Sequence, residues 1–385
     1  MEKETKKDFN ILKNFIAVNK PLIHKSDVDA VKKIISSGWI SSEGPNVKIF
    51  EKKLSNYVGH KYGVAVSSGT AALDIALKVL KLKKGDEIIV PNFTIISTIL
   101  PAIKLGLKVK LVDCNLEDWN MNIEQTINLI SKKTKVIVAT HIYNYPTRID
   151  ILKKICKKKK IFLIEDSAES LGQTIFKKKC GSFGDISTFS FYANKQITTG
   201  EGGMITTNNK LFYEKAKEYR NLCFGKKNRF NHNDIGWNYR MTNIQATLGI
   251  SQLKRINSII KKRHFVGKTY YKYLNKNKNL FIPIPEKKYS KNIYWVIGVV
   301  IKNKKLGLDG KKVMEKLKKF NIGSRPFFWP MHKQDVFRKY SFYKSKKFKN
   351  SEIISKYGLY LPSSLDLTKT QIKHISNCLN KIVSS

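Results

Sequence analysis

Residues 181–204 read GSFGDISTFSFYANKQITTGEGGM, a run of short apolar pieces broken by glycines. Lys195 lies between a strand-like stretch that carries Ser190 and a glycine-rich turn at 199–203. Such a turn lets the backbone approach a ligand closely. A Lys held in a cleft, with its pKa lowered by its neighbours, is the residue type that forms a Schiff base. Lys195 is therefore a candidate nucleophile, although the chain has 65 Lys and one alone means little.

A second segment, IFLIEDSAES at 161–170, places acids at the end of an apolar strand. In open α/β sheets, ligands bind at the carboxyl ends of the strands. A carboxylate buried there needs a cationic or hydrogen-bonding partner, and a protonated pyridine nitrogen is such a partner. Taken singly, Glu165 or Asp166 fits equally well as a cap for the following helix.

Two further segments carry polar residues at helix entries. Ser67-Ser68-Gly69-Thr70 lies between a strand and a helix, where backbone N–H groups and hydroxyls bind phosphate at the positive helix end. Ser190 offers a second hydroxyl for the same phosphate. An ordinary helix cap explains 67–70 equally well without the other segments. The stretch DIGWNYRMTN at 234–243 precedes a long helix, and is either a cap or a subunit contact that reaches a cofactor.

Apolar strands alternate with helices over most of the chain, which predicts an α/β fold with a parallel or mixed sheet buried on both faces. The predicted strands are 62–67, 87–90, 108–112, 135–140 and 161–165. The predicted helices are 27–36, 70–80, 94–105, 123–130, 149–156, 211–221 and 243–276. The last hundred residues, with a strand at 293–301 and a helix at 311–320, predict a smaller α+β domain.

The domain prediction follows from these changes in pattern. Residues 1–15 are charged and predicted to be a disordered or loosely packed lead-in. Residues 16–260 form the large domain and 261–385 the small C-terminal domain. An alternative packs residues 16–55 with the small domain.

The chain carries 73 Lys and Arg against 29 Asp and Glu, a formal net charge of +44. Clustered basic residues bind nucleic acid, but here only eight are Arg and the Lys are spread along the chain without a nucleic-acid-binding motif. A solvated Lys coat, with no specific nucleic-acid partner, is the favoured interpretation.

The five Cys form no CxxC pair, which argues against a disulfide framework or zinc site and for a reducing compartment. No metal site is predicted. The start of the chain has no apolar core typical of a signal peptide, and the longest apolar stretch, 294–301, is far too short to span a membrane. We therefore predict a cytoplasmic protein.

Taken together and in order, these segments resemble the DegT/DnrJ/StrS-type sugar-nucleotide aminotransferases, which depend on pyridoxal 5′-phosphate (PLP). The resemblance runs from about Pro21 to the C-terminal helix. It rests on the motifs at 67–77, 85–94, 164–170, 181–204 and 238–246. It implies the fold-type I PLP-dependent transferase fold, similar to aspartate aminotransferase, with a mixed seven-stranded-type sheet in the large domain.

The resemblance also implies roles for individual residues. Lys195 binds the cofactor covalently and moves a proton during transamination, which passes through pyridoxamine 5′-phosphate. Asp166 keeps the pyridine nitrogen protonated, and Glu169 lies near the cofactor 3-hydroxyl and the substrate. The phosphate is held by a group of small and hydroxyl residues, namely Ser68, Gly69, Thr70 and Ser190. Asn238 reaches the phosphate of the neighbouring subunit, which implies a homodimer with shared active sites.

Some positions depart from the family pattern. Many relatives stack an aromatic residue over the cofactor ring where this chain has Ile95, so stacking falls to Phe93 or to simple apolar contact. The usual His-Leu-Tyr-Gly reads His-Ile-Tyr-Asn at 141–144. Arg325 and His332 lie in the segment that the resemblance links to the nucleotide sugar, although His332 fits equally well as a structural histidine with satisfied hydrogen bonds.

The resemblance finally implies a reaction. A dehydratase branch of the family has His at the position of Lys195, so the Lys here favours transamination. The segments 165–172, 194–203, 220–225 and 324–332 are similar to the branch that makes GDP-perosamine. This implies L-glutamate as donor and the C4 ketone of a GDP-linked 4-keto-6-deoxy sugar as acceptor, for O-antigen or other surface polysaccharide. Alternatives are a UDP- or dTDP-linked ketosugar, aminated at C4 or C3, and, remotely, an inactive scaffold that binds nucleic acid or regulates.

Overall fold

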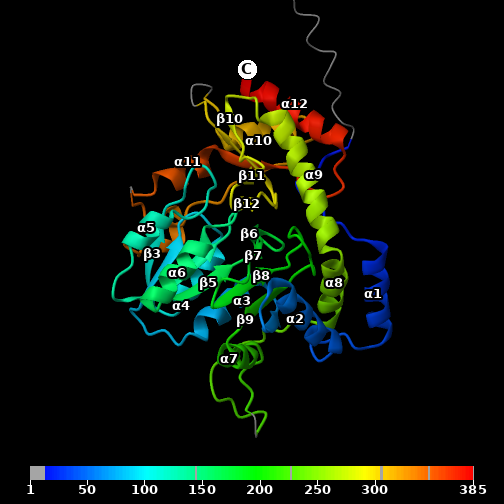
Figure 1. Ribbon diagram of the computed structural model, residues 1–385. Helices are drawn as coiled ribbons and strands as arrows, with labels where there is room; N and C mark the ends of the chain where they lie inside the picture. Colours follow the sequence, from blue (N-terminus) through cyan, green and yellow to red (C-terminus); the bar gives the residue numbers. More distant parts are fainter. Residues whose placement is uncertain (1–13, 144, 226–227, 304–306, 346, 385) are drawn as a thin grey trace, which may run out of the picture.

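The computed structural model describes residues 14–384, except 144, 226–227, 304–306 and 346. Most of the predicted lead-in therefore lies outside the described residues. Two sheets, each with its own helices, organise the chain (Figure 1). The prediction of an α/β fold with a smaller α+β unit at the C-terminal end agrees with this arrangement.

The larger sheet has seven strands in the order β1-β9-β8-β5-β4-β2-β3. Strand β9 is antiparallel to both of its neighbours, and the remaining pairs are parallel. Six strands consequently end at the same edge of the sheet. Their bounds are β1 Tyr62–Val66, β2 Glu87–Pro91, β3 Lys108–Val112, β4 Thr134–Thr140, β5 Phe162–Asp166 and β8 Ile186–Ser190, with β9 at Gly203–Thr207.

Helices cover both faces of this sheet because its strands are apolar on both sides. On β1, Val64 and Val66 belong to a core with α3 (Gly69–Lys78), whereas Ala65 between them packs on the opposite face. The first face is covered by α3, α4 (Leu100–Lys104) and α7 (Lys210–Arg220). The second is covered by α2 (Pro45–Val58), α6 (Ile149–Lys159) and α8 (Asn243–Lys254).

Two long helices of the sequence prediction are each divided. The segment 94–105 forms a short 3-10 turn, η1 (Ile96–Thr98), and then α4, which begins beside Pro101. Proline lacks the N–H that a helix interior needs, so a new helix starts there. The segment 243–276 forms α8 and α9 (Ile256–Leu274), separated at Arg255. The predicted helix at 123–130 is α5 (Ile123–Asn128).

The smaller sheet has four strands in the order β10-β13-β15-β14. The single strand predicted at 293–301 is shorter, β13 at Ile297–Ile301, and the other three strands of this sheet were missed because each is only two to four residues long. The missed strands are β10 (Leu280–Phe281), β14 (Arg325–Pro326) and β15 (Gly358–Leu361). The helices packed with them are α10 (Gly310–Lys318), α11 (Lys349–Tyr357) and α12 (Lys369–Ser384). Two short hairpins, β6–β7 (Thr174–Ile175, Lys178–Lys179) and β11–β12 (Glu286–Lys287, Ser290–Lys291), complete the strands.

Helix α9 runs from one core into the other (Figure 1). Its first turns bury Ile256 and Ile259 with α2, and its later turns bury Val266 and Tyr270 with the small sheet. The predicted boundary at residue 260 therefore falls inside a continuous helix. No helix within the described ranges is both long enough and apolar enough to cross a membrane.

The N-terminal segment divides between the two units. Ile16 pairs with Ile322 and is buried in the small core. In contrast, α1 (Lys25–Ser36) packs on α8, where buried Asp27 accepts a hydrogen bond from Ser251 at 2.6 Å and pairs with Arg255. Only the first few residues of 16–55 thus pack with the small unit.

The packing of α2 on α8 gives a test of this fold. At Gly249, an added Cβ would lie 2.6 Å from the ring of fully buried Phe50. A Gly-to-Ala change within a helix normally stabilises by about 1 kcal/mol. We expect Gly249→Ala to lower the free energy of unfolding by about 1–3 kcal/mol instead, because the core has no room. Urea unfolding measures this change in the free energy of unfolding.

Lys254→Ala, at an exposed position of α8, is the control and should change the free energy of unfolding by less than about 0.5 kcal/mol. A Gly249→Ala variant that is more stable than the natural protein would contradict the packing of α2 on α8.

Candidate active site

A cavity of about 320 Å³ opens where β1, β4, β5 and β8 end. Its walls come from the edge of the large sheet, from the loop that carries Lys195 and from the small sheet. The residues used below that line it are Ser68, Gly69, Thr70, Ile95, Asp166, Glu169, Ser190, Lys195, Glu201, Trp295, Phe328 and Tyr360. Most of the residues predicted from sequence are therefore brought together in one place.

Asp166 is the last residue of β5 and is fully buried at the floor of this cavity. One carboxylate oxygen, Oδ1, accepts a hydrogen bond from the backbone N–H of Ala168 at 3.1 Å. The other, Oδ2, makes no hydrogen bond of normal geometry among the described residues, although the neighbouring Thr140 side chain acts on the carboxylate and lowers its pKa. Burial raises the pKa of Asp166, although the Ala168 hydrogen bond and the charge of Lys195 act against it. A buried carboxylate with a free oxygen is suited to bind a cationic N–H group of a ligand.

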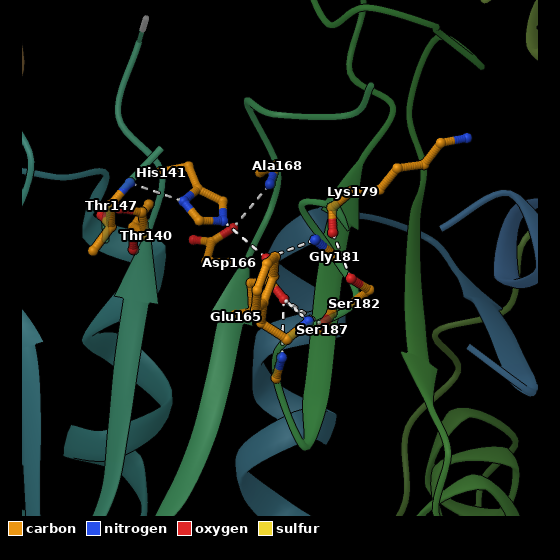
Figure 2. A network of polar contacts seen from close by, with 12 residues as sticks. Thr140, His141, Thr147, Glu165, Asp166, Ala168, Lys179, Gly181, Ser182 and Ser187 are labelled. Atoms are coloured by element: carbon orange, nitrogen blue, oxygen red, sulfur yellow. Dashed lines mark hydrogen bonds and ion pairs between the residues drawn. The ribbon is translucent and has the colours of Figure 1, made fainter. Parts of the chain in front are cut away.

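The neighbouring Glu165 has a structural task. Its side chain points to the opposite face of β5 and accepts hydrogen bonds from the backbone N–H groups of Gly181, Phe183 and Gly184, at 2.6–2.9 Å. Figure 2 shows the carboxylate beside the loop that enters β8. Burial pushes its pKa upward, but hydrogen bonds from His141 and from the loop bring the pKa below its ordinary value. Glu165 thereby fixes β8, and with it Ser190, relative to Asp166.

His141 completes this support. Its Nδ1 accepts a hydrogen bond from the backbone N–H of Thr147 at 3.1 Å, so the ring proton is on Nε2, which donates to Glu165 at 2.9 Å (Figure 2). The backbone N–H of His141 donates to the carbonyl of Asp166. Cys180 brings a third possible metal donor within 4.8 Å, but the Glu165 oxygens already accept the hydrogen bonds described above. The absence of a metal site stays a prediction.

An anion cradle lies at the start of α3. Ser68 caps the helix by accepting a hydrogen bond from the N–H of Ala71 at 3.1 Å. A Cβ added at Gly69 would lie 2.9 Å from the Cβ of Ser190, so the start of the helix touches the end of β8 at a point where only glycine fits. The Thr70 hydroxyl is within 2.8 Å of the Ser97 hydroxyl. A free helix N-terminus surrounded by hydroxyl groups is a favourable phosphate site.

Lys195 projects into the cavity between two carboxylates and an aromatic ring. Its Nζ lies 3.9 Å from Oε1 of Glu169 and 3.8 Å from the ring centre of Trp295. Burial lowers the pKa of Lys195, while the charges of Glu169 and Asp166 act in the opposite direction. Burial likewise raises the pKa of Glu169, to about 7, against the opposing charge of Lys195. Both groups are therefore closer to neutrality than they would be in water, as expected for proton-transfer groups.

The structure separates the remaining predicted residues. Ile95 lines the cavity, whereas Phe93 is fully buried behind it against Tyr143, with ring centres 5.9 Å apart. Phe93 is thus not in position to stack on a ligand in this cavity. Asn238 is exposed and does not line the cavity of its own chain.

Arg325 and His332 have different surroundings. Arg325 is exposed and lines an adjoining cavity of about 570 Å³, which shares Tyr192, Asn194 and Tyr360 with the first. His332 is fully buried and lines neither cavity. Its ring nitrogens contact Asn92 at 3.0 Å and Glu352 at 3.1 Å, which is the structural alternative considered from the sequence.

Some lining residues were not identified from the sequence. Trp295, Phe328 and Tyr360 come from the small sheet and its loops. Trp295 was placed inside a predicted strand, although the strand begins only at Ile297. No local signal distinguishes such residues from core positions, since their contact with the site depends on how the two units pack.

Comparison with known proteins identifies the family. Residues 21–380 match the DegT/DnrJ/EryC1/StrS aminotransferase family. The chain is 33% identical to the GDP-perosamine synthase of Vibrio cholerae over 368 residues, which covers 94% of this chain and 98% of the relative.

Solved structures agree with this match. The Helicobacter pylori aminotransferase PseC, involved in pseudoaminic acid biosynthesis, superposes with a TM-score of 0.90 at 26% identity, over 96% of this chain and 100% of the other. An E. coli GDP-4-keto-6-deoxy-D-mannose-3-dehydratase with bound hydrated PLP gives a TM-score of 0.87 at 26% identity, over 95% of this chain and 100% of the other. The chain belongs to the DegT/DnrJ/EryC1/StrS family and is a PLP-dependent sugar aminotransferase.

The cavity fits this cofactor. The Oδ2 oxygen of Asp166 suits a protonated pyridine nitrogen, the start of α3 with Gly69 suits a phosphate, and the amine of Lys195 is available for a covalent bond. These are the residues that would hold PLP.

The shifted pKa of Glu169 predicts a pH-dependent stability of the cofactor-free protein. The folded pKa of about 7 exceeds the ordinary value of 4.5, so folding is favoured by the protonated acid and stability falls as pH rises from 4.5 to 7. We expect Glu169→Gln to gain up to about 3 kcal/mol over the natural protein between pH 5 and pH 8, measured by urea unfolding. Because the charges of Glu169 and Lys195 act on each other, the difference between the two proteins reports the titration of this pair.

Glu87 provides the matched control. Although burial acts against it, hydrogen bonds from Lys110 and Ser131 hold its pKa well below the ordinary value, so it stays ionised in the folded protein from pH 5 to pH 8. The stability difference between Glu87→Gln and the natural protein should be the same at both pH values. An equally constant difference for Glu169→Gln would contradict the shifted pKa of Glu169.

Proposed function

We propose that this aminotransferase moves the amino group of L-glutamate to the C4 ketone of GDP-4-keto-6-deoxy-D-mannose and so makes GDP-perosamine for a surface polysaccharide. The observation that carries the proposal is Lys195, whose amine lies in the cavity beside Glu169 and Trp295, within reach of the charge of Asp166. The similarity to the Vibrio cholerae enzyme along nearly the whole chain supports the sugar. The dispersed cysteines support a cytoplasmic location.

When bound, PLP supplies an electron sink that makes the α-proton of an amino acid removable. The residues of the chain do the rest. Asp166 would keep the proton on the ring nitrogen. Lys195 would accept the proton from the amino-acid α-carbon and deliver it to C4′ of the cofactor, a task for which its lowered pKa is suited. Gly69, Thr70 and Ser190 would fix the phosphate, so that these proton transfers occur at short distance.

The choice of transamination over dehydration follows from the same lysine. The dehydratase branch has His where this chain has Lys195, and a histidine cannot bind the cofactor covalently through an amine. Because the E. coli dehydratase shares the fold, the fold alone does not select the reaction. The side chain at position 195 would select it.

Arg325 is the residue we propose for contact with the nucleotide end of the substrate. It lines the adjoining cavity, and a guanidinium binds phosphate oxygens in pairs. The shared wall residues Tyr192, Asn194 and Tyr360 connect this cavity to that of Lys195. A sugar placed between them would present its ketone to the cofactor while its diphosphate approaches Arg325. His332 would support the wall through Asn92 and Glu352.

The reaction can be tested with a panel of ketosugars. With L-glutamate, the purified enzyme should convert GDP-4-keto-6-deoxy-D-mannose at least about tenfold faster than UDP- or dTDP-linked 4-keto sugars, measured by chromatography of the aminated product. Lys195→Ala should reduce the rate by a factor of about 10³ or more. Faster conversion of a UDP- or dTDP-linked sugar would overturn the substrate. A protein that binds no PLP and aminates none of these sugars would overturn the enzymatic proposal.

A homodimer with shared sites is part of this proposal. Asn238 is exposed, while the backbone carbonyl of the neighbouring Tyr239 accepts a hydrogen bond from the backbone N–H of Ser67, directly after β1, at 2.8 Å. The segment therefore runs beside the anion cradle with the Asn238 side chain outside the cavity of its own chain. We propose that Asn238 reaches the cofactor phosphate of the partner subunit.

Mixed dimers test this arrangement. Lys195→Ala and Asn238→Ala chains, each nearly inactive alone, should recover about one quarter of the natural activity after subunit exchange, since half of the dimers would contain one intact site of two. The activity of the exchanged mixture measures it. As control, Asn238→Ala mixed with the double variant Lys195→Ala/Asn238→Ala should recover nothing, because no chain can then supply Asn238 to the site that keeps Lys195. No recovery in the first mixture, once native mass spectrometry shows mixed dimers, would place each site within one chain.

A further inference from the structure

We infer that the indole ring of Trp295 binds the protonated amine of Lys195 by a cation–π interaction, and that residues of helix α9 hold the Trp295 ring in this position. When Lys195 is not bonded to the cofactor, the indole ring retains its ammonium form inside the cavity. The inference uses the role of Lys195 but does not depend on which sugar the enzyme aminates.

The ring and the amine are in direct contact. Nζ of Lys195 lies 3.8 Å from the centre of the Trp295 ring, and Trp295 is only 4% exposed. The indole N–H donates to the backbone carbonyl of Asn194 at 2.9 Å. Trp295 thus binds both the side chain of Lys195 and the backbone beside it. An ammonium over a Trp face is the strongest common cation–π pair, particularly when shielded from water.

The backbone that delivers Trp295 is unusual. Tyr294, directly before it, has φ of 53°, a left-handed conformation that bulky residues seldom adopt. A Cβ added at Gly267 of α9 would lie 2.1 Å from the Tyr294 ring, so the ring packs onto the helix backbone. The chain therefore bends sharply at Tyr294, and the bend turns the next side chain toward the large sheet.

One turn earlier on α9, Arg263 fixes the same bend. Arg263 is 2% exposed, and its guanidinium forms no ion pair with a carboxylate among the described residues. It donates instead to the carbonyls of Trp295 at 3.1 Å and Ser363 at 2.8 Å. Burial lowers the pKa of Arg263 to about 10. A buried guanidinium that binds only carbonyls is costly, and its placement here holds Trp295 in the orientation that faces Lys195.

The other groups around Lys195 define what Trp295 adds. Glu169 and Asp166 favour the protonated amine, burial disfavours it, and Glu201 lies elsewhere on the cavity wall. The aromatic ring favours the protonated amine without adding a negative charge. The ring therefore stabilises the ammonium group of Lys195 without placing a further negative charge in the cavity, as an additional acid would do.

Competitive acetylation of the cofactor-free enzyme tests this contact. The modification of the peptide that carries Lys195 is followed by mass spectrometry from pH 6 to pH 11, and the pH midpoint reports protonation of the amine independently of access. Trp295→Leu should lower the midpoint by about one pH unit, whereas Trp295→Phe should lower it by less than half as much. Phe328→Leu, in the same cavity wall but without a ring contact to Lys195, should leave it unchanged.

An isosteric change tests the same contact even if the Trp295→Leu variant does not fold. Fluorinated tryptophan, incorporated throughout the chain, withdraws electron density from the ring face with little change in shape, and should also lower the Lys195 midpoint. In the Trp295→Phe background, fluorinated tryptophan should have no effect. An unchanged midpoint in both fluorinated natural protein and Trp295→Leu overturns the inference. Failure of Lys195 to bind PLP would refute the proposed function separately, because the labelling uses no cofactor.

Discussion

The site depends on one buried carboxylate that takes no part in the chemistry. Glu165 accepts hydrogen bonds from His141 and from three backbone N–H groups of the loop before β8. Since consecutive residues of a strand point to opposite faces, fixing Glu165 on one side fixes Asp166 on the other. The same bonds fix the register of β8 and so the place of Ser190. A charge that is buried but fully hydrogen-bonded is a rigid anchor, because losing any one donor leaves it uncompensated.

Next to Glu165 along β5 lies Asp166, a buried carboxylate whose hydrogen bonds are incomplete. Oδ2 of Asp166 makes no hydrogen bond of normal geometry within the described residues, one residue away from an acid whose oxygens are all engaged. This difference in hydrogen bonding distinguishes the structural role of Glu165 from the ligand-binding role proposed for Asp166. A satisfied group stabilises the fold, whereas a buried group with a free lone pair gains its partner only when a ligand arrives. The pKa of Asp166 is raised by burial and that of Glu165 is lowered by its donors, in accordance with this division.

The small unit contributes lining residues to the cavity that holds Lys195. Helix α9 belongs to both cores, and its residues contact the bend at Tyr294 and the backbone of Trp295 and so fix their position. The cavity consequently has one wall from each unit. The surrounding net charge of +44 is not reproduced inside, where Lys195 is accompanied by Asp166, Glu169 and Glu201. The excess of Lys is a property of the surface and bears on association with anions.

The sequence alone determined five strands of the large sheet and several of the residues at the strand ends, whereas the strand order and the antiparallel direction of β9 came from the structure. Strand ends follow from local apolar patterns, and parallel strands end at one edge, so Asp166, Ser190 and the start of α3 were brought together correctly. Only the tertiary structure decided that Ile95 faces the cavity while Phe93 does not, that His332 turns inward to Asn92, and that Trp295 meets Lys195 from a hundred residues away. Side-chain direction in a loop or after a bend is set by packing against distant segments, and no local pattern encodes which segments those are.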